Sequence, residues 1–301
     1  MGCGAVGAAL SVALALGGAE VYVISRSRFG CSREPVEVRG LGSGLVNVCG
    51  WPEAPRESDA LIFATKAYDV PAAVDLSLSH GFRPRIAVSV QNGLGSLELV
   101  ESAFHSSAGG LLYLGLTRLG ECRALYTGGR RVVLGCRRQC DHEALRGLAD
   151  VLASGGLEVE VAKADDFEGE RWLKLAVNTA INPLTLITWS RNGRIASDKL
   201  LAETASAIAA ETGRVGEALG VRLPEDPAEA TLRTARETSE NCSSTVQDVA
   251  GGRRTELEYL NMAVWERSLR LSFRATLNLL AYESAEAAAG WLKGRRSPCE
   301  G

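Results

Sequence analysis

Hydrophobic and polar residues recur with a different periodicity in the first half of the chain than in the second. In the first half, short runs rich in β-branched residues alternate with segments whose apolar residues recur at helical spacing. The continuous runs predict buried strands at 19–25, 59–65, 85–90, 109–119, 132–135 and 157–162. The segments between them predict helices at 8–18, 70–78, 96–104 and 141–154. This alternation predicts an α/β fold with a parallel sheet covered by helices.

The periodicity changes at about Asp165. Beyond it, helical spacing dominates and the continuous runs of β-branched residues disappear. We therefore predict two domains, as the length of 301 residues also suggests. Residues 1–164 are expected to form a Rossmann-like, doubly wound domain, and residues 165–301 an all-helical domain.

Composition narrows the function classes. The net charge of -3 gives no basic surface for nucleic acid. No apolar run reaches the roughly 18 residues of a membrane span, and no basic segment marks a signal peptide. We therefore expect a cytoplasmic protein that acts on a small molecule and binds neither nucleic acid nor a membrane. Its oligomeric state stays open between a monomer and a homodimer.

The eight cysteines are scattered, with no C-x-x-C motif and no Cys/His pairing at zinc spacing. With only three histidines in the chain, this pattern argues against a metal enzyme. We expect reduced, mostly buried thiols and no metal site.

The first residues, MGCGAVG, carry the G-x-G-x-x-G spacing of a dinucleotide-binding loop at Gly2, Gly4 and Gly7. Such a loop holds a pyrophosphate on its backbone N–H groups and on the following helix N-terminus. It normally follows a buried central strand, yet only Met1 precedes it here. Each buried unpaired group left by a missing strand costs about 1–3 kcal/mol. We therefore expect the protein to start upstream, with Met1 as an internal position of the first strand.

Polar residues follow three of the predicted strands. NAD sites usually place an acidic residue about 20 positions after the glycines, to bind the ribose hydroxyl. Here that strand ends in Ser25-Arg26-Ser27-Arg28, without a carboxylate. Arg26 is suited to a 2′-phosphate. This favours NADPH, with NADH as the alternative. Lys66 and Asn92 follow two further strands, at the end where such sheets bind ligands.

The stretch RWLKLAVNTAINPLT predicts an almost wholly apolar, buried helix. Lys174, Asn178 and Asn182 recur at i, i+4 and i+8 and therefore line one face of it. Buried amine and amide groups need partners, so this stripe points to a ligand site. Pro183 is expected to stop or kink the helix, and Asn192 follows in TWSRNGRI.

A second informative stretch is ENCSSTVQDVAGGRRTELEYLN. Thr255 and Glu258 have the spacing of a capping box, which predicts that a helix begins at Thr255. Glu256 would then lie in the first turn, where the helix dipole favours a carboxylate.

Taken together, these motifs resemble the ketopantoate reductase (2-dehydropantoate 2-reductase) family over almost the whole chain. The resemblance rests on the glycine loop, KAYDV, QNGLG, KLAVNTAINPLT, RNG, SSTVQD and RTELEYLN. It implies that Lys174 is the catalytic lysine and Glu256 its acidic counterpart. It further implies substrate-side roles for Asn178, Asn182, Asn192 and Ser244, and cofactor-side roles for Arg26, Lys66 and Asn92. The sequence departs from the family at Asn261-Met262, where Asn-Gly is usual, which points to a difference in the local helix geometry.

The function implied by the resemblance is NADPH-dependent reduction of 2-dehydropantoate to (R)-pantoate, a step toward pantothenate and coenzyme A. Two alternatives stay open. One is a reductase of another branched 2-oxo acid on the same scaffold. The other is a non-catalytic NADP(H)-binding regulator, against which the Lys174 stripe argues, because a binding module needs no buried lysine.

Overall fold

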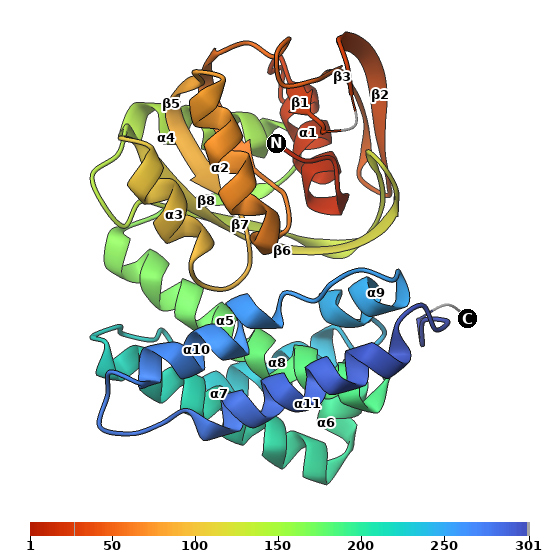
Figure 1. Ribbon diagram of the computed structural model, residues 1–301, viewed down its shortest axis with the longest axis vertical. Coiled ribbons are helices and arrows are strands. Elements are labelled where there is room, and N and C mark those ends of the chain that lie inside the picture. The colour runs from red at the N-terminus through yellow and green to blue at the C-terminus, as the bar shows by residue number, and fades with distance from the viewer. Residues whose placement is uncertain (27, 300–301) are drawn as a thin grey trace. The chain divides into compact units, whose positions relative to one another are not determined.

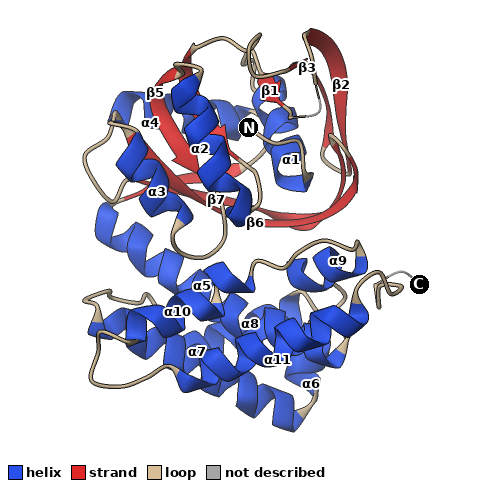
Figure 2. Ribbon diagram, viewed as in Figure 1, coloured by secondary structure: helices blue, strands red, loops and turns tan. Residues whose placement is uncertain are grey.

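The computed structural model describes residues 1–26 and 28–299, which form two compact units. Unit 1 comprises Met1–Gln91 and Gly95–Phe167; unit 2 comprises Asn92–Leu94 and the chain from Glu168 onward. Every strand among the described residues lies in unit 1 (Figure 2). The domain boundary expected at residue 164 coincides with the first residue of α5 (Ala164–Thr188). The change from unit 1 to unit 2 falls within this helix, between Phe167 and Glu168.

Unit 1 contains an eight-stranded sheet in the order β1-β3-β2-β7-β6-β5-β4, with β8 paired to β7. The strands are β1 (Tyr22–Ile24), β2 (Cys31–Arg39), β3 (Gly42–Cys49), β4 (Glu57–Phe63), β5 (Arg83–Ser89), β6 (Ser107–Gly120), β7 (Arg123–Gly135) and β8 (Glu158–Ala162). β4, β5 and β6 are parallel neighbours, whereas β2 with β3 and β6 with β7 are antiparallel.

The expectation of a parallel sheet is therefore wrong in part, because the sheet is mixed. The β2–β3 hairpin is the part that the hydrophobic pattern missed. Its strands bury Val36, Val38, Val46 and Val48 on one face, while several positions between them are partly or fully exposed. An antiparallel hairpin with one covered face produces alternation and not the continuous apolar run of a doubly buried strand.

Helices cover both faces of the unit 1 sheet (Figure 1). α1 (Ala5–Leu16) and α4 (His142–Ser154) pack against Ile86 and Val88 of β5 in one core cluster. α2 (Val70–Ser79) and α3 (Ser96–Ala103) pack against Ala87, which points the other way, in a second cluster. This two-sided burial is why β5 reads as an uninterrupted apolar run.

Met1 and Gly2 bridge β1 and β4, the two outer strands of the order. The Met1 amino group donates to the Ile62 carbonyl, and Ala64 N–H donates to the Met1 carbonyl at 2.9 Å. Gly2 N–H donates to the Ile24 carbonyl at 3.0 Å. These contacts fix the start of the glycine loop against both strands. Burial lowers the pKa of the Met1 amino group from 8.0 to about 5.

Unit 2 is helical throughout its described residues. After α5 come α6 (Gly193–Ser197), α7 (Lys199–Ala218), α8 (Pro227–Glu237), α9 (Ser244–Ala250), the 3₁₀ helix η2 (Leu257–Tyr259), α10 (Asn261–Ser268) and α11 (Thr276–Leu292). Trp172 of α5 is buried against Gly216 of α7, where a Cβ would come within 2.9 Å of the ring. In the described part of the chain, no helix has both the length and the apolar character needed to cross a membrane.

The cysteines correct another expectation. All eight are paired, as Cys3–Cys122, Cys31–Cys49, Cys136–Cys140 and Cys242–Cys299. The prediction of reduced thiols is therefore wrong. Each bond joins segments that the fold brings together, and such pairing cannot be deduced from spacing alone.

Candidate active site

The glycine loop leaves the N-terminus of α1 open. A Cβ at Gly7 would lie 2.0 Å from the Gly2 carbonyl oxygen, so only glycine fits at this crossing. Gly4 is the N-cap residue of α1 and offers no side chain to its backbone N–H groups. A Cβ at Gly4 would meet nothing within 4 Å. The open space and the uncapped helix end together fit a bound pyrophosphate.

The expected cofactor residues of unit 1 lie at the carboxyl ends of β1 and β4. Arg26 follows β1, and its guanidinium pairs with Asp69 at 3.1 Å. Lys66 follows β4 and is the N-cap residue of the 3₁₀ helix η1 (Ala67–Asp69). Next to it, Thr65 Oγ1 is buried without a hydrogen-bond partner in the structure. Thr65 is a candidate that sequence reasoning missed, because a lone threonine after a strand carries no signal.

Asn92 was predicted on the cofactor side, and this role stays a prediction. Its segment, Asn92–Leu94, belongs to unit 2. Leu94 N–H donates to the Tyr259 carbonyl at 2.9 Å, and Arg171 Nη2 donates to the Gly93 carbonyl at 3.4 Å. Gly93 has φ +89°, and a Cβ there would lie 2.2 Å from the Tyr259 oxygen. The segment Asn92–Leu94 is therefore packed against η2, whose N-cap residue is Glu256.

α5 carries the polar stripe as predicted from its spacing. Lys174 and Asn178 are half-buried and Asn182 is 5% exposed, so all three face restricted surroundings. Burial lowers the pKa of Lys174 from 10.5 to about 7, against the opposing effect of the Glu170 carboxylate. An amine with this pKa exchanges its proton readily at neutral pH. Pro183 was expected to stop or kink the helix; it does not stop it, because α5 continues to Thr188.

The other residues expected on the substrate side differ in their surroundings. Glu256 is buried at 9% exposure and is the N-cap residue of η2. Asn192 is buried; its Nδ2 donates to Thr238 Oγ1 at 2.9 Å, while its Oδ1 has no hydrogen-bond partner. Ser244 is the exposed first residue of α9. The side chain that caps α9 is that of Ser243.

The helix predicted to begin at Thr255 is absent from the structure. The turn at 257–259 is a 3₁₀ helix, and α10 begins only at Asn261. The capping box fails because both side chains bond elsewhere: Thr255 Oγ1 to Glu286, and Glu258 to Arg254. The position of Glu256 therefore depends on tertiary contacts and not on a helix dipole.

A buried network of hydrogen bonds, which sequence reasoning missed, connects α5 to neighbouring helices. Thr179, beside Asn178, donates or accepts at Thr212 Oγ1 of α7 at 2.9 Å. Its carbonyl accepts from Asn261 Nδ2 at 2.9 Å. Asn278 of α11 accepts from Asn261 at 3.1 Å and donates to Glu211 of α7 at 2.9 Å. These bonds tie α5 to three neighbouring helices and restrict its rotation. The departure at Asn261-Met262 thus keeps the asparagine in a structural role.

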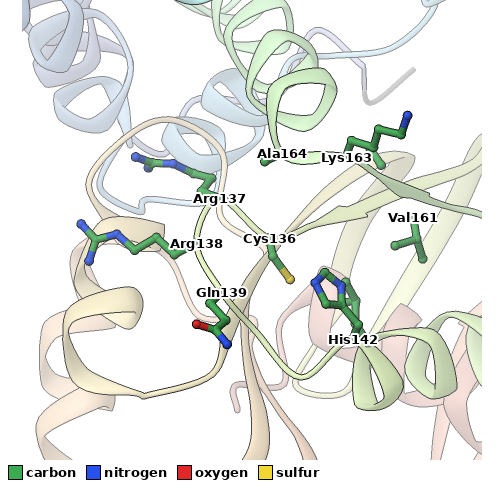
Figure 3. Close-up of a pocket in the computed structure, with 10 residues that line it drawn as sticks. Cys136, Arg137, Arg138, Gln139, His142, Val161, Lys163 and Ala164 are labelled. Atoms are coloured by element: carbon green, nitrogen blue, oxygen red, sulfur yellow. The ribbon is translucent and has the colours of Figure 1, made fainter.

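A separate cavity of about 420 Å³ lies in unit 1 beside the Cys136–Cys140 disulfide (Figure 3). Figure 3 shows Cys136 and His142 pointing toward each other, whereas Arg138 and Lys163 extend away from them. Among the described residues, Cys136, Cys140 and His142 have side-chain atoms close enough together to hold a metal ion. Zinc needs thiolates, and both sulfurs are held in a disulfide, so we assign no metal here. None of the predicted site residues lines this cavity.

The chain matches known proteins over nearly its whole length. Residues 1–139 match the family described as Ketopantoate reductase PanE/ApbA, and residues 166–288 match its C-terminal family, Ketopantoate reductase PanE/ApbA C terminal. The chain is 33% identical to a 2-dehydropantoate 2-reductase of Pyrobaculum aerophilum, over 99% of this chain and 98% of the relative.

Two solved structures share the fold. A PanE/ApbA family ketopantoate reductase from Ralstonia eutropha JMP134 is 26% identical, with TM-score 0.83 over 97% of this chain and 98% of its own. A D-mandelate dehydrogenase, solved with NADH and anilino(oxo)acetate, has the same TM-score and coverage of 97% of each chain, at 18% identity, which is evidence of the fold alone. The two family matches and the relative at 33% identity establish that this chain belongs to the ketopantoate reductase family.

Proposed function

We propose that the chain reduces 2-dehydropantoate (ketopantoate) to (R)-pantoate with a nicotinamide cofactor, as part of pantothenate and coenzyme A biosynthesis. The observation that carries this proposal is Lys174, an amine on a buried helix face whose pKa burial lowers to about 7. Membership of the family supplies the reaction, and Lys174 supplies a group suited to its proton transfer.

When bound, the nicotinamide supplies the hydride that the C2 ketone receives. Protonated Lys174 Nζ donates its proton to the ketone oxygen as that oxygen gains charge. General-acid catalysis of this kind contributes typically about 10²–10⁴ in rate. Asn178, Asn182, Asn192 and Ser244 would hold the carboxylate and hydroxyl groups of the substrate. Glu256 would orient the substrate hydroxyl or the lysine.

Unit 1 fits the cofactor. Gly2, Gly4 and Gly7 leave room at the uncapped α1 N-terminus, and the unpartnered Thr65 Oγ1 and the neighbouring Lys66 lie at the end of β4. A preference for NADPH would rest on Arg26, which must exchange Asp69 for the 2′-phosphate. NADH is the alternative that leaves this ion pair intact.

A second candidate function is reduction of another branched 2-oxo acid on the same scaffold, the alternative that the sequence motifs leave open. A substrate panel separates the two. We expect consumption of reduced nicotinamide, followed by absorbance, to be fastest with 2-dehydropantoate among 2-oxo acids with branched and aromatic side chains. A higher kcat/KM for an aromatic 2-oxo acid would overturn the proposal, and no turnover with any of them would favour a regulator.

Assembly and location stay predictions. A homodimer is testable by sedimentation of the purified chain. A cytoplasmic location must be reconciled with four disulfides, which persist in oxidising compartments and in intracellular proteins of hyperthermophiles. Thiol titration of protein taken directly from its cells would tell whether the bonds exist there.

A further inference from the structure

Two cysteines and a histidine lie together where β7 ends and α4 begins. Cys136 directly follows the last residue of β7, and His142 is the first residue of α4. Cys140 Sγ lies 3.9 Å from His142 Nδ1, and one potential ligand atom from each of the three residues lies within 4.8 Å of the other two. Thiolate sulfur and imidazole nitrogen are ligands that zinc favours. In the disulfide form no thiolate is present, so a metal site requires reduction of this bond.

Contacts other than the disulfide hold these residues near one another. Gly135, directly before Cys136, is paired with β6 on one side and with β8 on the other. At the far end of the loop, Asp141 N–H donates to Ser106 Oγ at 2.8 Å, and the Asp141 carboxylate accepts from Arg85 at 3.1 Å. Because both ends of the loop are fixed by hydrogen bonds, opening of the disulfide leaves the two sulfurs and the imidazole close together.

The spacing of the three side chains suits one zinc ion with an open fourth position. Ligand atoms around a tetrahedral zinc lie about 3.5–4 Å apart. The Cα atoms of Cys136 and Cys140 are 6.2 Å apart, so rotation of the two side chains is enough to separate the sulfurs to that spacing. Cys136 and His142 both line the cavity of about 420 Å³, through which a water molecule can reach the fourth position. Three protein ligands and one water form a common zinc coordination.

The cationic side chains around the cavity do not oppose a metal ion at this place. Arg137 donates to the Glu98 carboxylate at 2.7 Å, which offsets its charge. Figure 3 shows Arg138 and Lys163 extending away from the sulfur and the imidazole. Two thiolates carry the charge that balances Zn²⁺, so the filled site would be neutral.

We propose that reduction of the Cys136–Cys140 disulfide creates a zinc site made of Cys136, Cys140 and His142. A dithiol reductant transfers two electrons and two protons to the disulfide, which yields two thiols while the reductant itself becomes a disulfide. Zn²⁺ then displaces both thiol protons to solvent and binds the two thiolates and the neutral imidazole. The ion replaces the disulfide as the link between β7 and α4, so unit 1 keeps this link in oxidising and in reducing surroundings. The inference goes beyond the proposed function and does not depend on it.

The test is titration of the whole chain with Co²⁺, a spectroscopic probe for zinc sites, after reduction and removal of the reductant. We expect the reduced chain to bind one equivalent of Co²⁺ with thiolate-to-cobalt charge-transfer absorption, and Zn²⁺ to displace it. The oxidised chain should show no such absorption. The double variant Cys136→Ser/Cys140→Ser should lose this equivalent. His142→Gln should raise the Kd about tenfold or more, at least the loss caused by removing an outer partner of a metal ligand.

Two matched controls separate this site from binding to any reduced thiol pair or histidine. The double variant Cys31→Ser/Cys49→Ser removes another disulfide of unit 1 and should keep the equivalent of Co²⁺. His105→Gln removes an exposed histidine outside the cavity lining and should leave the Kd within about twofold. Circular dichroism with Zn²⁺ present should show that the reduced chain stays folded.

Alkylation of the reduced chain followed by peptide mapping gives a second measurement. Zn²⁺ should protect Cys136 and Cys140 from alkylation and leave the other thiols reactive, because a metal-bound thiolate is a poor nucleophile. Equal alkylation with and without Zn²⁺ would overturn the proposal. So would Co²⁺ absorption that survives in Cys136→Ser/Cys140→Ser, an unchanged Kd in His142→Gln, or unfolding of the reduced chain in the presence of Zn²⁺.

Discussion

The polar face of α5 and the glycine-loop region of unit 1 are built in contrasting ways. On α5, Lys174, Asn178 and Asn182 come from a single helix and share a face by periodicity alone. In unit 1, Gly4, Arg26 and Lys66 come from three segments, which the contacts of Met1 and Gly2 with β1 and β4 hold together. The contrast teaches that a local pattern can predict a polar helix face, whereas a site built from several segments depends on tertiary contacts.

Replacing Lys174 should have the largest effect on turnover and little effect on cofactor binding in unit 1. Lys174→Ala removes the group with the lowered pKa, so kcat should fall by about 10²–10⁴. The affinity for NADH should stay within about twofold, because the glycine loop lies in unit 1. Stopped-flow turnover and calorimetric titration measure the two quantities separately.

Lys199→Ala is the matched control, since Lys199 is an exposed lysine of α7 that pairs with Glu203. It should leave kcat unchanged. Comparable losses in both variants, or an unchanged kcat in Lys174→Ala, would remove Lys174 from its assigned role.

The sequence predicted most elements whose burial is uniform. β5 and α5 are buried on nearly all sides, and their apolar runs indicated them correctly. The β2–β3 hairpin was missed because only one of its faces is covered. At the candidate site, the stripe of Lys174, Asn178 and Asn182 on α5 follows from spacing. The pairing of Arg26 with Asp69 could not be predicted, since no local pattern relates the two residues.

Removing a disulfide should destabilise the protein more when the bond encloses a longer stretch of chain, because the entropy term rises with the logarithm of the loop length. Cys3–Cys122 spans 119 residues, whereas Cys136–Cys140 spans 4. Loss of the first, as the double serine variant, should lower the free energy of unfolding by about 2–5 kcal/mol, and loss of the second by less. Urea unfolding of both variants measures the difference.

The same two variants also test whether the Cys3–Cys122 disulfide supports cofactor binding. Without Cys3–Cys122 the glycine loop loses its covalent link to the turn between β6 and β7, so NADH should bind less tightly. The variant that lacks Cys136–Cys140 should bind NADH as the unmodified chain does. Unfolding of both variants at the same urea concentration would show that the Cys3–Cys122 disulfide does not restrict the unfolded chain more than the Cys136–Cys140 disulfide does.

The pH dependence of the rate tests the α5 region without changing a residue. Lys174 must carry a proton to donate one, and its pKa is about 7. The kcat/KM for ketone reduction should therefore fall about tenfold per pH unit above 7, while oxidation of pantoate should rise through the same pH. Because the Glu170 carboxylate raises this pKa, Glu170→Gln should move the decline to lower pH. A rate that stays level well above pH 7 would show a lysine of ordinary pKa or a different acid.

Two local rules in unit 2 are outweighed by tertiary contacts. Pro183 was expected to stop or kink α5, and the helix does not stop there. It continues past Pro183 because Leu184 and Leu186 beyond it are buried in the core. Thr255 was expected to begin a helix, but Glu286 of α11 draws it away from its capping position. In both places packing or a distant partner outweighs a local preference.

The smallest expected effect concerns Arg26, the residue that sequence reasoning favoured for NADPH. Its side chain is 65% exposed and held by Asp69, and exposed pairs of this kind are worth about 1 kcal/mol or less. Arg26→Ala should therefore weaken NADPH by only about fivefold or less and leave NADH unchanged. Asp69→Asn should strengthen NADPH, because it releases the guanidinium for the 2′-phosphate while removing a carboxylate. Calorimetric titration of the two variants measures both effects. A much larger loss of NADPH affinity in Arg26→Ala would contradict this prediction and make Arg26 the main determinant of cofactor preference. Equal loss of NADH and NADPH would instead mean that Arg26 contacts a group that both cofactors share.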